Sequence, residues 1–110
     1  MQITNNVTAM TGSEKQIAWA QDIKQREMES LDSLCNLFYV GRELSKRGLG
    51  DVEFAKLGMV TPQDAQDFCD SVKNRVVEML DDRTSAKWWI DNGVAAVLRA
   101  RQLVLDEMSI

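Results

Sequence analysis

The residues of this sequence that could most readily do chemistry are carboxylates concentrated between Pro62 and Asp82. That segment of the 110-residue chain holds six acidic residues against two basic ones, Lys73 and Arg75. The six acids are Asp64, Asp67, Asp70, Glu78, Asp81 and Asp82. Carboxylates can pair with arginine and lysine, bind metal ions or transfer protons. Because the net charge of the whole chain is −4, this one segment accounts for all of it.

Metal binding and proton transfer both lack their usual supporting residues. The chain has no histidine, which is the commonest metal ligand and general base. Its two cysteines, Cys35 and Cys69, cannot complete a four-ligand zinc site, and the acids do not have the spacing of an EF-hand calcium loop. We therefore expect no catalytic residue, no metal site and no cofactor, and we predict that the protein is not an enzyme.

The spacing of the carboxylates predicts an acidic helix face. At about 100° per residue, four of the acids fall on the side opposite the apolar residues Phe68, Val72 and Val76. These four are Asp64, Asp67, Glu78 and Asp81. Such a row can occupy a basic protein groove that otherwise holds phosphates. The alternative interpretation is a solvated face that keeps the protein soluble.

The adjacent tryptophans Trp88 and Trp89 form a second candidate binding feature. Neighbouring residues on a helix point about 100° apart, so the two rings can hardly enter the same core. One of them is expected to line a groove or an interface, where tryptophan is enriched, although a large ring covering a small core is the competing interpretation. The predicted partner-binding residues are therefore the six acids together with Trp88 and Trp89.

Charge and composition exclude several classes of partner. Acidic residues outnumber basic ones by 17 to 13, so we expect no direct binding to nucleic acid. No apolar stretch approaches the roughly 20 residues that span a bilayer, and residues 1–6 lack the basic start and apolar core of a signal peptide. Cys35 and Cys69 lie among apolar residues and are predicted to be buried. These features favour a cytoplasmic protein with reduced thiols and no membrane partner.

The elements that must position these residues are all predicted to be helices. Residues 1–12 are polar and aperiodic and predict a flexible arm, so that residues 13–110 form a single helical domain. Ser13 and Gln16 have the spacing of a capping box, and a helical apolar pattern continues from there toward Arg47. Lys24 and Glu27 fall within the apolar arc of that pattern. The helix must therefore bend there, or its first half must project past the core.

Four further helices follow from caps and helical spacing. They are predicted over residues 51–57, from Pro62 to about Asp82 behind the N-cap Thr61, from residue 86 to a stop at Asn92-Gly93, and from Val94 to about Glu107. With one proline and no alternating strand pattern, the expected fold is an all-α, compact bundle of three to five helices.

Two segments of the chain resemble known proteins. GSEKQIAWA at residues 12–20 and AKWWIDN at residues 86–92 resemble segments of small, mostly uncharacterised proteins of phages, prophages and other mobile elements. The resemblance implies a host-directed inhibitor, of which anti-CRISPR and other anti-defence proteins are examples. It carries over no catalytic residue.

These observations lead to one main hypothesis and one alternative. The main hypothesis is a non-enzymatic binding protein whose acidic helix occupies a basic surface of a protein partner, such as a host defence or nucleic-acid-processing complex. The alternative is a structural or accessory phage protein that forms a homodimer through exposed apolar residues of the first long helix: Leu37, Val40 and Leu44.

Overall fold

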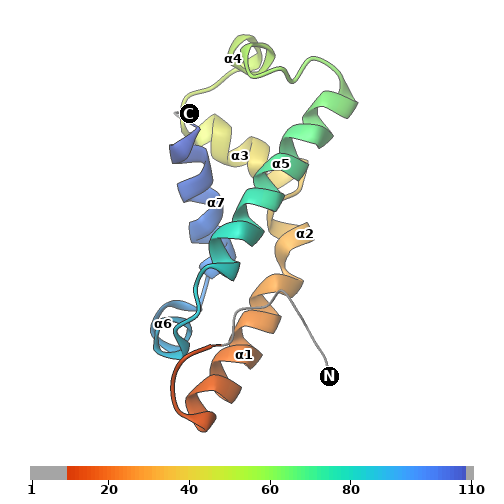
Figure 1. The fold of residues 1–110 in the computed structure, drawn as a ribbon. Helices are drawn as coiled ribbons and strands as arrows, with labels where there is room; N and C mark the ends of the chain where they lie inside the picture. The colour runs from red at the N-terminus through yellow and green to blue at the C-terminus, as the bar shows by residue number, and fades with distance from the viewer. Residues whose placement is uncertain (1–9, 109–110) are drawn as a thin grey trace.

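The computed structural model describes residues 10–108, and its regular elements are helices (Figure 1). Those residues form seven helices and no strand, with one isolated backbone bridge between Thr11 and Ser85. The helices are α1 (Glu14–Glu29), α2 (Leu31–Leu34), α3 (Leu37–Lys46), α4 (Asp51–Lys56), α5 (Pro62–Asp81), α6 (Ala86–Asn92) and α7 (Ala96–Glu107). The predicted all-α class is confirmed.

Helix α1 begins at the predicted capping box. The Ser13 hydroxyl accepts a hydrogen bond from the Gln16 N–H (3.2 Å), and the Gln16 side chain accepts one from the Ser13 N–H (3.1 Å). These two bonds satisfy backbone donors that the first turn of a helix leaves without partners. The sequence thus located the start of the first helix correctly.

The pattern that continues toward Arg47 is not one helix, because local side-chain bonds interrupt it twice. The Ser30 hydroxyl donates to the carbonyl of Glu27 (2.6 Å) at the end of α1. The Asn36 side chain then accepts from the Tyr39 N–H (3.0 Å) and acts as the N-cap of α3. Serine and asparagine side chains compete in this way with the backbone bonds of a helix. The chain therefore forms three helices here, which raises the five predicted helices to seven.

The charged residues inside the apolar arc of α1 tie this helix to its neighbours. Lys24 lies 3.0 Å from Asp81 of α5. A carboxylate oxygen of Glu27 accepts a hydrogen bond from the Val97 N–H in the first turn of α7 (3.1 Å). Helix α1 runs unbroken through both positions, because the two charged groups face partners on other helices.

The later helices lie close to their predicted positions, with one correction at α7. Helices α4, α5 and α6 begin and end within a residue or two of the predicted limits. Helix α7 begins at Ala96, two residues after the predicted start at Val94. Ala95 adopts a left-handed conformation with φ of 62°, so a right-handed helix cannot run through it. Val94 lies in the turn before it and is 80% exposed.

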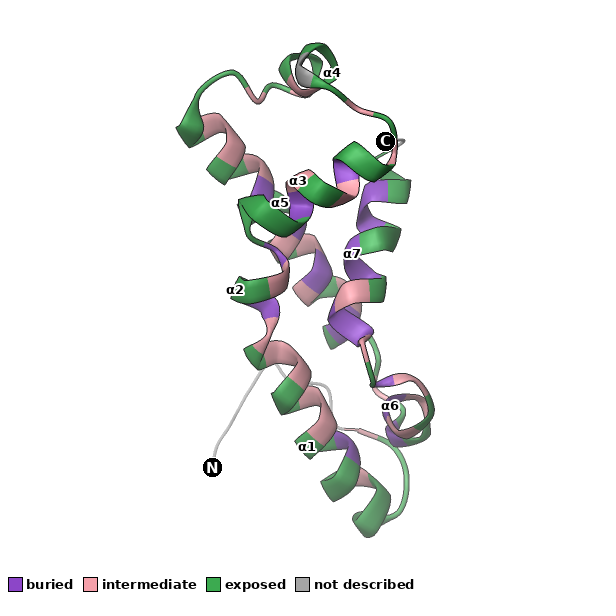
Figure 2. Ribbon diagram, turned by 180° about the vertical axis from the view of Figure 1, so that it is seen from behind, coloured by how far each residue is buried: buried purple, intermediate pink, exposed green. Residues whose placement is uncertain are grey.

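The described chain is elongated, with extents of 50 × 28 × 21 Å. Helix α1 packs against α6 at one end, α5 packs against α7, and α4 stands apart at the opposite end (Figure 1). The buried residues form one cluster, whose largest fully buried side chains include Trp89, Leu44 and Leu105. Figure 2 shows the buried parts of the ribbon, which include stretches of α5 and α7. Cys35 and Cys69 belong to the cluster, as predicted.

Most of the arm predicted over residues 1–12 lies outside the described residues. At its described end, the Thr11 N–H donates to the carbonyl of Thr84 (2.8 Å), and the Ala86 N–H donates to the carbonyl of Thr11 (2.9 Å). The backbone is therefore bonded to the start of α6 from Thr11, two residues before the predicted start of the domain at Ser13.

The exposed apolar set predicted on the first long helix requires a correction. Val40 and Leu44 are fully buried in the core, while Leu37 is 50% exposed. The neighbouring Phe38, which the hypothesis did not include, is 64% exposed. The error arose because the direction of α3 changes after the break at Asn36, which no wheel drawn through a continuous helix can represent.

Candidate protein-binding surface

The carboxylates of α5 lie on the outer side of a helix whose other side is in the core. Thr61 caps the helix and Pro62 opens it, as predicted. Its inner side buries Cys69, Val72, Val76 and Leu80. On its outer side four acids are exposed, and we call them the acidic face: Asp67, Asp70, Glu78 and Asp81.

Asp64 has a structural role that separates it from the acidic face. Its carboxylate accepts hydrogen bonds from the N–H groups of Thr61 (3.0 Å) and Val60 (3.3 Å), and its own N–H donates to the Thr61 hydroxyl (3.1 Å). These bonds to the carboxylate, those of Thr61 first, lower the pKa of Asp64. Asp64 therefore completes the cap of α5, and its place in a binding row stays a prediction.

The basic residues of α5 do not neutralise its acidic face, because they pair mainly with acids on other helices. Lys73 pairs with Asp32 of α2. Arg75 pairs with Glu107 of α7 (2.8 Å) and lies 3.7 Å from Glu78. These pairs raise the pKa of both bases, in each case chiefly through the hydrogen bond to the acid. The cations of α5 thus help to hold the fold together.

Asp67 and Asp70 of the acidic face accept hydrogen bonds from neutral side chains of the same helix, and Asp70 also lies close enough to Lys73 to raise the pKa of that lysine. Asp67 accepts a hydrogen bond from the neutral amide of Gln63 (2.8 Å), and Asp70 accepts one from Gln66 (2.9 Å). By contrast, Asp81 is 3.0 Å from Lys24 although its side chain remains 55% exposed. Within the described residues, the first half of α5 thus carries two exposed carboxylates without an ion pair.

The two tryptophans have different environments. Trp89 is fully buried, and its indole N–H donates to the carbonyl of Arg83 (2.8 Å). Trp88 is half-buried, and the guanidinium of Arg83 lies 4.8 Å from its ring centre. The rings meet edge to face at 5.1 Å. Trp89 is therefore a core residue, which corrects its predicted place in the binding surface, and only Trp88 of the pair reaches the surface.

Trp88 lines a cleft of about 440 Å³ where the end of α5 meets α6 and α7. Asp82, another predicted residue, lies on the same wall. We call this hollow the α5–α7 cleft, and it is lined by Met79, Leu80, Asp82, Arg83, Trp88, Asn92, Ala96, Arg99, Ala100 and Leu103. Sequence reasoning missed Arg83 and Arg99, because they come from different elements and no linear motif joins them.

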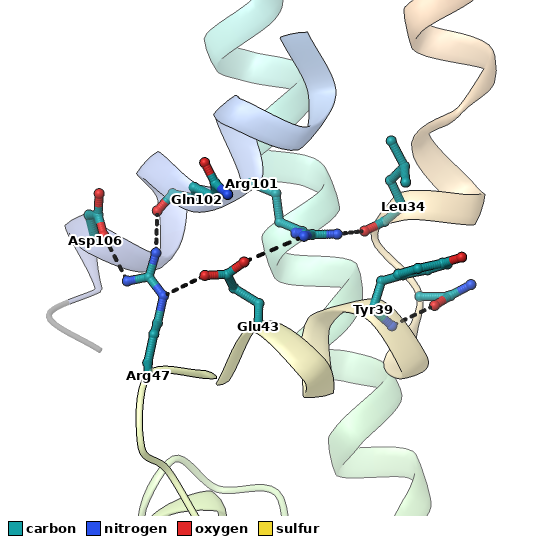
Figure 3. A network of polar contacts seen from close by, with 8 residues as sticks. Leu34, Tyr39, Glu43, Arg47, Arg101, Gln102 and Asp106 are labelled. Atoms are coloured by element: carbon teal, nitrogen blue, oxygen red, sulfur yellow. Dashed lines mark hydrogen bonds and ion pairs between the residues drawn. The ribbon is translucent and has the colours of Figure 1, made fainter. Parts of the chain in front are cut away.

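A network of ion pairs and hydrogen bonds joins α3 to α7 (Figure 3). Arg101 is 5% exposed, donates to the carbonyl of Leu34 (2.7 Å) and lies 3.6 Å from Glu43. Arg47 bonds to the same Glu43 (3.1 Å) and to Asp106 (2.7 Å). The hydrogen bonds to Asp106 and then Glu43 raise the pKa of Arg47. These charges serve the fold, since each acts on a group within the chain.

Thiols and acids are the side chains of this chain that could react or bind a metal ion. Burial raises the pKa of Cys35 and of Cys69, so both thiols stay protonated at neutral pH and are poor nucleophiles. Within residues 10–108, no three acids or cysteines gather closely enough to hold a metal ion. In the same part of the chain, no helix has the length and apolar character needed to cross a bilayer.

No family model matches the chain, and no curated protein or solved structure matches it either. The candidate site consequently rests on the chain's own residues. They offer exposed carboxylates on one helix face and, beyond the end of that helix, a cleft with an indole and two guanidinium groups.

Proposed function

We propose that the protein is a non-enzymatic binding protein whose acidic face occupies a basic surface on a protein partner. The observation that carries the proposal is the state of Asp67 and Asp70, which are exposed, accept hydrogen bonds from neutral glutamines and form no ion pair within residues 10–108. Carboxylates in this state can accept charge-assisted hydrogen bonds from arginine and lysine without first breaking an internal ion pair. The charges of the acidic face would also orient the two proteins relative to each other and raise the rate at which they associate.

The partner class that we favour is a complex that handles nucleic acid, and in particular a host defence complex. Such complexes carry basic grooves for phosphates, and a helix with carboxylates on one side can compete for the same arginines and lysines. The resemblance of residues 12–20 and 86–92 to mobile-element proteins supports this context. The same negative charge argues against direct binding of this chain to nucleic acid, and the site of action would be the host cytoplasm.

The test compares two triple variants that change the charge equally. Asp67→Lys, Asp70→Lys and Glu78→Lys reverse three charges on the acidic face. Asp22→Lys, Glu29→Lys and Asp91→Lys reverse three exposed acids on α1 and α6. Each protein is immobilised and offered host lysate, and retained proteins are identified by mass spectrometry. We expect a partner that binds the wild type and the α1/α6 variant but not the acidic-face variant.

Two results would contradict the proposal. One is a set of retained proteins that is the same for all three immobilised chains. The other is a purified partner whose affinity does not fall as the salt concentration rises, because contacts between exposed charges weaken with ionic strength. Asp64 and Asp81 are left unchanged, since the first caps α5 and the second pairs with α1.

A second candidate function is self-association through α3, favoured by the exposure of Leu37 and Phe38. Two adjacent large apolar side chains on a surface helix are a common feature of subunit contacts. Sedimentation of the wild type and of the Leu37→Ser, Phe38→Ser variant tests it. A monomer at all concentrations would exclude this function and leave the main proposal standing.

A further inference from the structure

We propose that the α5–α7 cleft binds a small aromatic acid, a ligand with a planar ring system and a single anionic group. The site is distinct from the acidic face and does not depend on the proposed function. Its evidence is the combination of an apolar floor, an indole wall and two arginines that no carboxylate pairs with in the described part of the chain.

The floor of the cleft is apolar and is hollow because two of its side chains are small. Ala96 and Ala100 stand one turn apart on α7 and are 3% and 4% exposed. Leu80 and Leu103 complete the floor from α5 and α7. The volume of about 440 Å³ falls within the range of small-molecule sites, which are mostly apolar with a few placed polar groups.

The cations at the rim are held by neutral groups. Arg83 lies against the ring of Trp88, at 4.8 Å from the ring centre. Arg99 donates to the carbonyl of Asn92 (2.8 Å), the last residue of α6, and to the carbonyl of Val94 in the turn that follows. Stacking on an indole and bonding to carbonyls both position a guanidinium without an ion pair to a carboxylate. An anion entering the cleft would therefore meet two oriented donors.

The surroundings of the cleft restrict the ligand to a small one with little charge. Asp82 lies on the wall itself, and Asp81 and Glu78 follow along the acidic face. A polyanion such as nucleic acid would be repelled by this row. The carboxylate of a small aromatic acid can reach the arginines while the ring system of the ligand covers Trp88 and the floor. Such a ligand uses both the cationic rim and the apolar floor of the cleft.

The probe for the test is 8-anilinonaphthalene-1-sulfonate, an aromatic anion whose fluorescence rises in apolar sites. N-phenyl-1-naphthylamine, which has the same rings without the charge, is the neutral comparison. We expect saturable binding of one anionic probe per chain. In amide spectra of the wild type, the residues whose signals shift should be those at 79–83, 88–92 and 96–103. This mapping needs no variant and so does not depend on the folding of a mutant.

Variants then test the role of charge. Arg83→Gln with Arg99→Gln should weaken binding of the anionic probe by about tenfold or more, since the charge-assisted hydrogen bonds to its sulfonate are lost. Binding of the neutral probe should not change. The matched control is Arg42→Gln with Lys46→Gln, which removes the same charge from a second hollow between α3, α4 and α5. Its affinity for the anionic probe should equal that of the wild type.

Three outcomes would overturn the proposal. The first is that the shifted amide signals are confined to the second hollow, between α3, α4 and α5. The second is that both double variants weaken binding of the anionic probe equally, and the third is that the wild type binds the charged and neutral probes with equal affinity. The first would place the ligand elsewhere, and the other two would show that the arginines of the cleft do not recognise an anion. None of these outcomes bears on the acidic face, which the lysate experiment tests separately.

Discussion

Glu27 of α1 caps α7 across 70 residues of sequence, by accepting a hydrogen bond from the Val97 N–H at 3.1 Å. Helix α7 needs this outside partner because its own N-cap residue is Ala95, which has no side-chain acceptor. A carboxylate at this position also interacts favourably with the positive end of the helix dipole.

This relationship predicts that Glu27→Ala destabilises the protein by about 1–2 kcal/mol, the usual cost of losing an N-cap. Glu27→Gln should lose less, because an amide oxygen can still accept the bond. Urea unfolding followed by circular dichroism provides the measurement. Glu29→Ala is the matched control, since Glu29 is exposed near the end of the same helix. Equal decreases in the free energy of unfolding for Glu27→Ala and Glu29→Ala would contradict the capping role.

Two glycines should respond oppositely to substitution by alanine. A Cβ at Gly93 would lie 2.3 Å from Ile23 and 2.4 Å from the carbonyl of Trp89, whereas a Cβ at Gly41 would meet nothing within 4 Å. Gly93→Ala should cost about 1–3 kcal/mol through overpacking. Gly41→Ala, inside α3, should stabilise by about 0.5–1 kcal/mol through helix propensity. The midpoints of thermal unfolding of the two variants should move in opposite directions. A higher midpoint for Gly93→Ala than for the wild type would disprove the close packing of α1 on α6.

The Asp64 cap should make part of the stability depend on pH. Because its pKa is lower in the folded state than its ordinary value of 3.8, its contribution is complete above that value and is lost as the pH falls through the folded pKa. Asp64→Asn should reduce this loss of stability in acid. Asp67→Asn serves as the control, because the carboxylate of Asp67 is bonded to the Gln63 side chain and takes no part in the cap. The check is the urea midpoint as a function of acid pH. An unaltered pH profile in Asp64→Asn would refute the prediction.

The network in Figure 3 predicts unequal effects for two acids that both bind Arg47. Glu43→Ala should cost about 3 kcal/mol or more, because it leaves the buried charge of Arg101 without its counter-ion. Asp106→Ala should cost at most about 1 kcal/mol, since its side chain is 59% exposed. Adding Arg101→Met to Glu43→Ala should recover part of the loss. Equal effects of the two alanine variants on the free energy of unfolding would show that burial does not govern this network.

Local sequence signals located most of the helices. Ser13 with Gln16, Thr61 with Pro62, and the Asn92-Gly93 stop are short-range devices whose bonds or steric preferences involve residues at most four apart. The apolar spacing of α5 also identified its buried side, so the exposure of Asp67, Glu78 and Asp81 on the opposite side followed directly. Asp70, which the spacing did not place in that row, is exposed as well. Burial of the two cysteines followed from their apolar neighbours.

Contacts between distant residues escaped the same reasoning. The assignment of Trp89 to a binding surface failed because the fold buries its ring completely. That of Val40 and Leu44 to a surface failed because α3, after the break at Asn36, packs against α5. Likewise, Glu27 lies in an apolar arc because its carboxylate binds the Val97 N–H of α7, a contact between residues 70 positions apart.

The sequence by itself thus determined the helical class, the main caps and the location of the negative charge, because these depend on spacing within one segment. Only the tertiary structure decided which charges remain available, that Trp88 and not Trp89 reaches the surface, and that Arg83 and Arg99 meet at one cleft. The physical reason is that a side chain's availability depends on whether another element supplies a partner or covers it. That partner can lie anywhere along the chain.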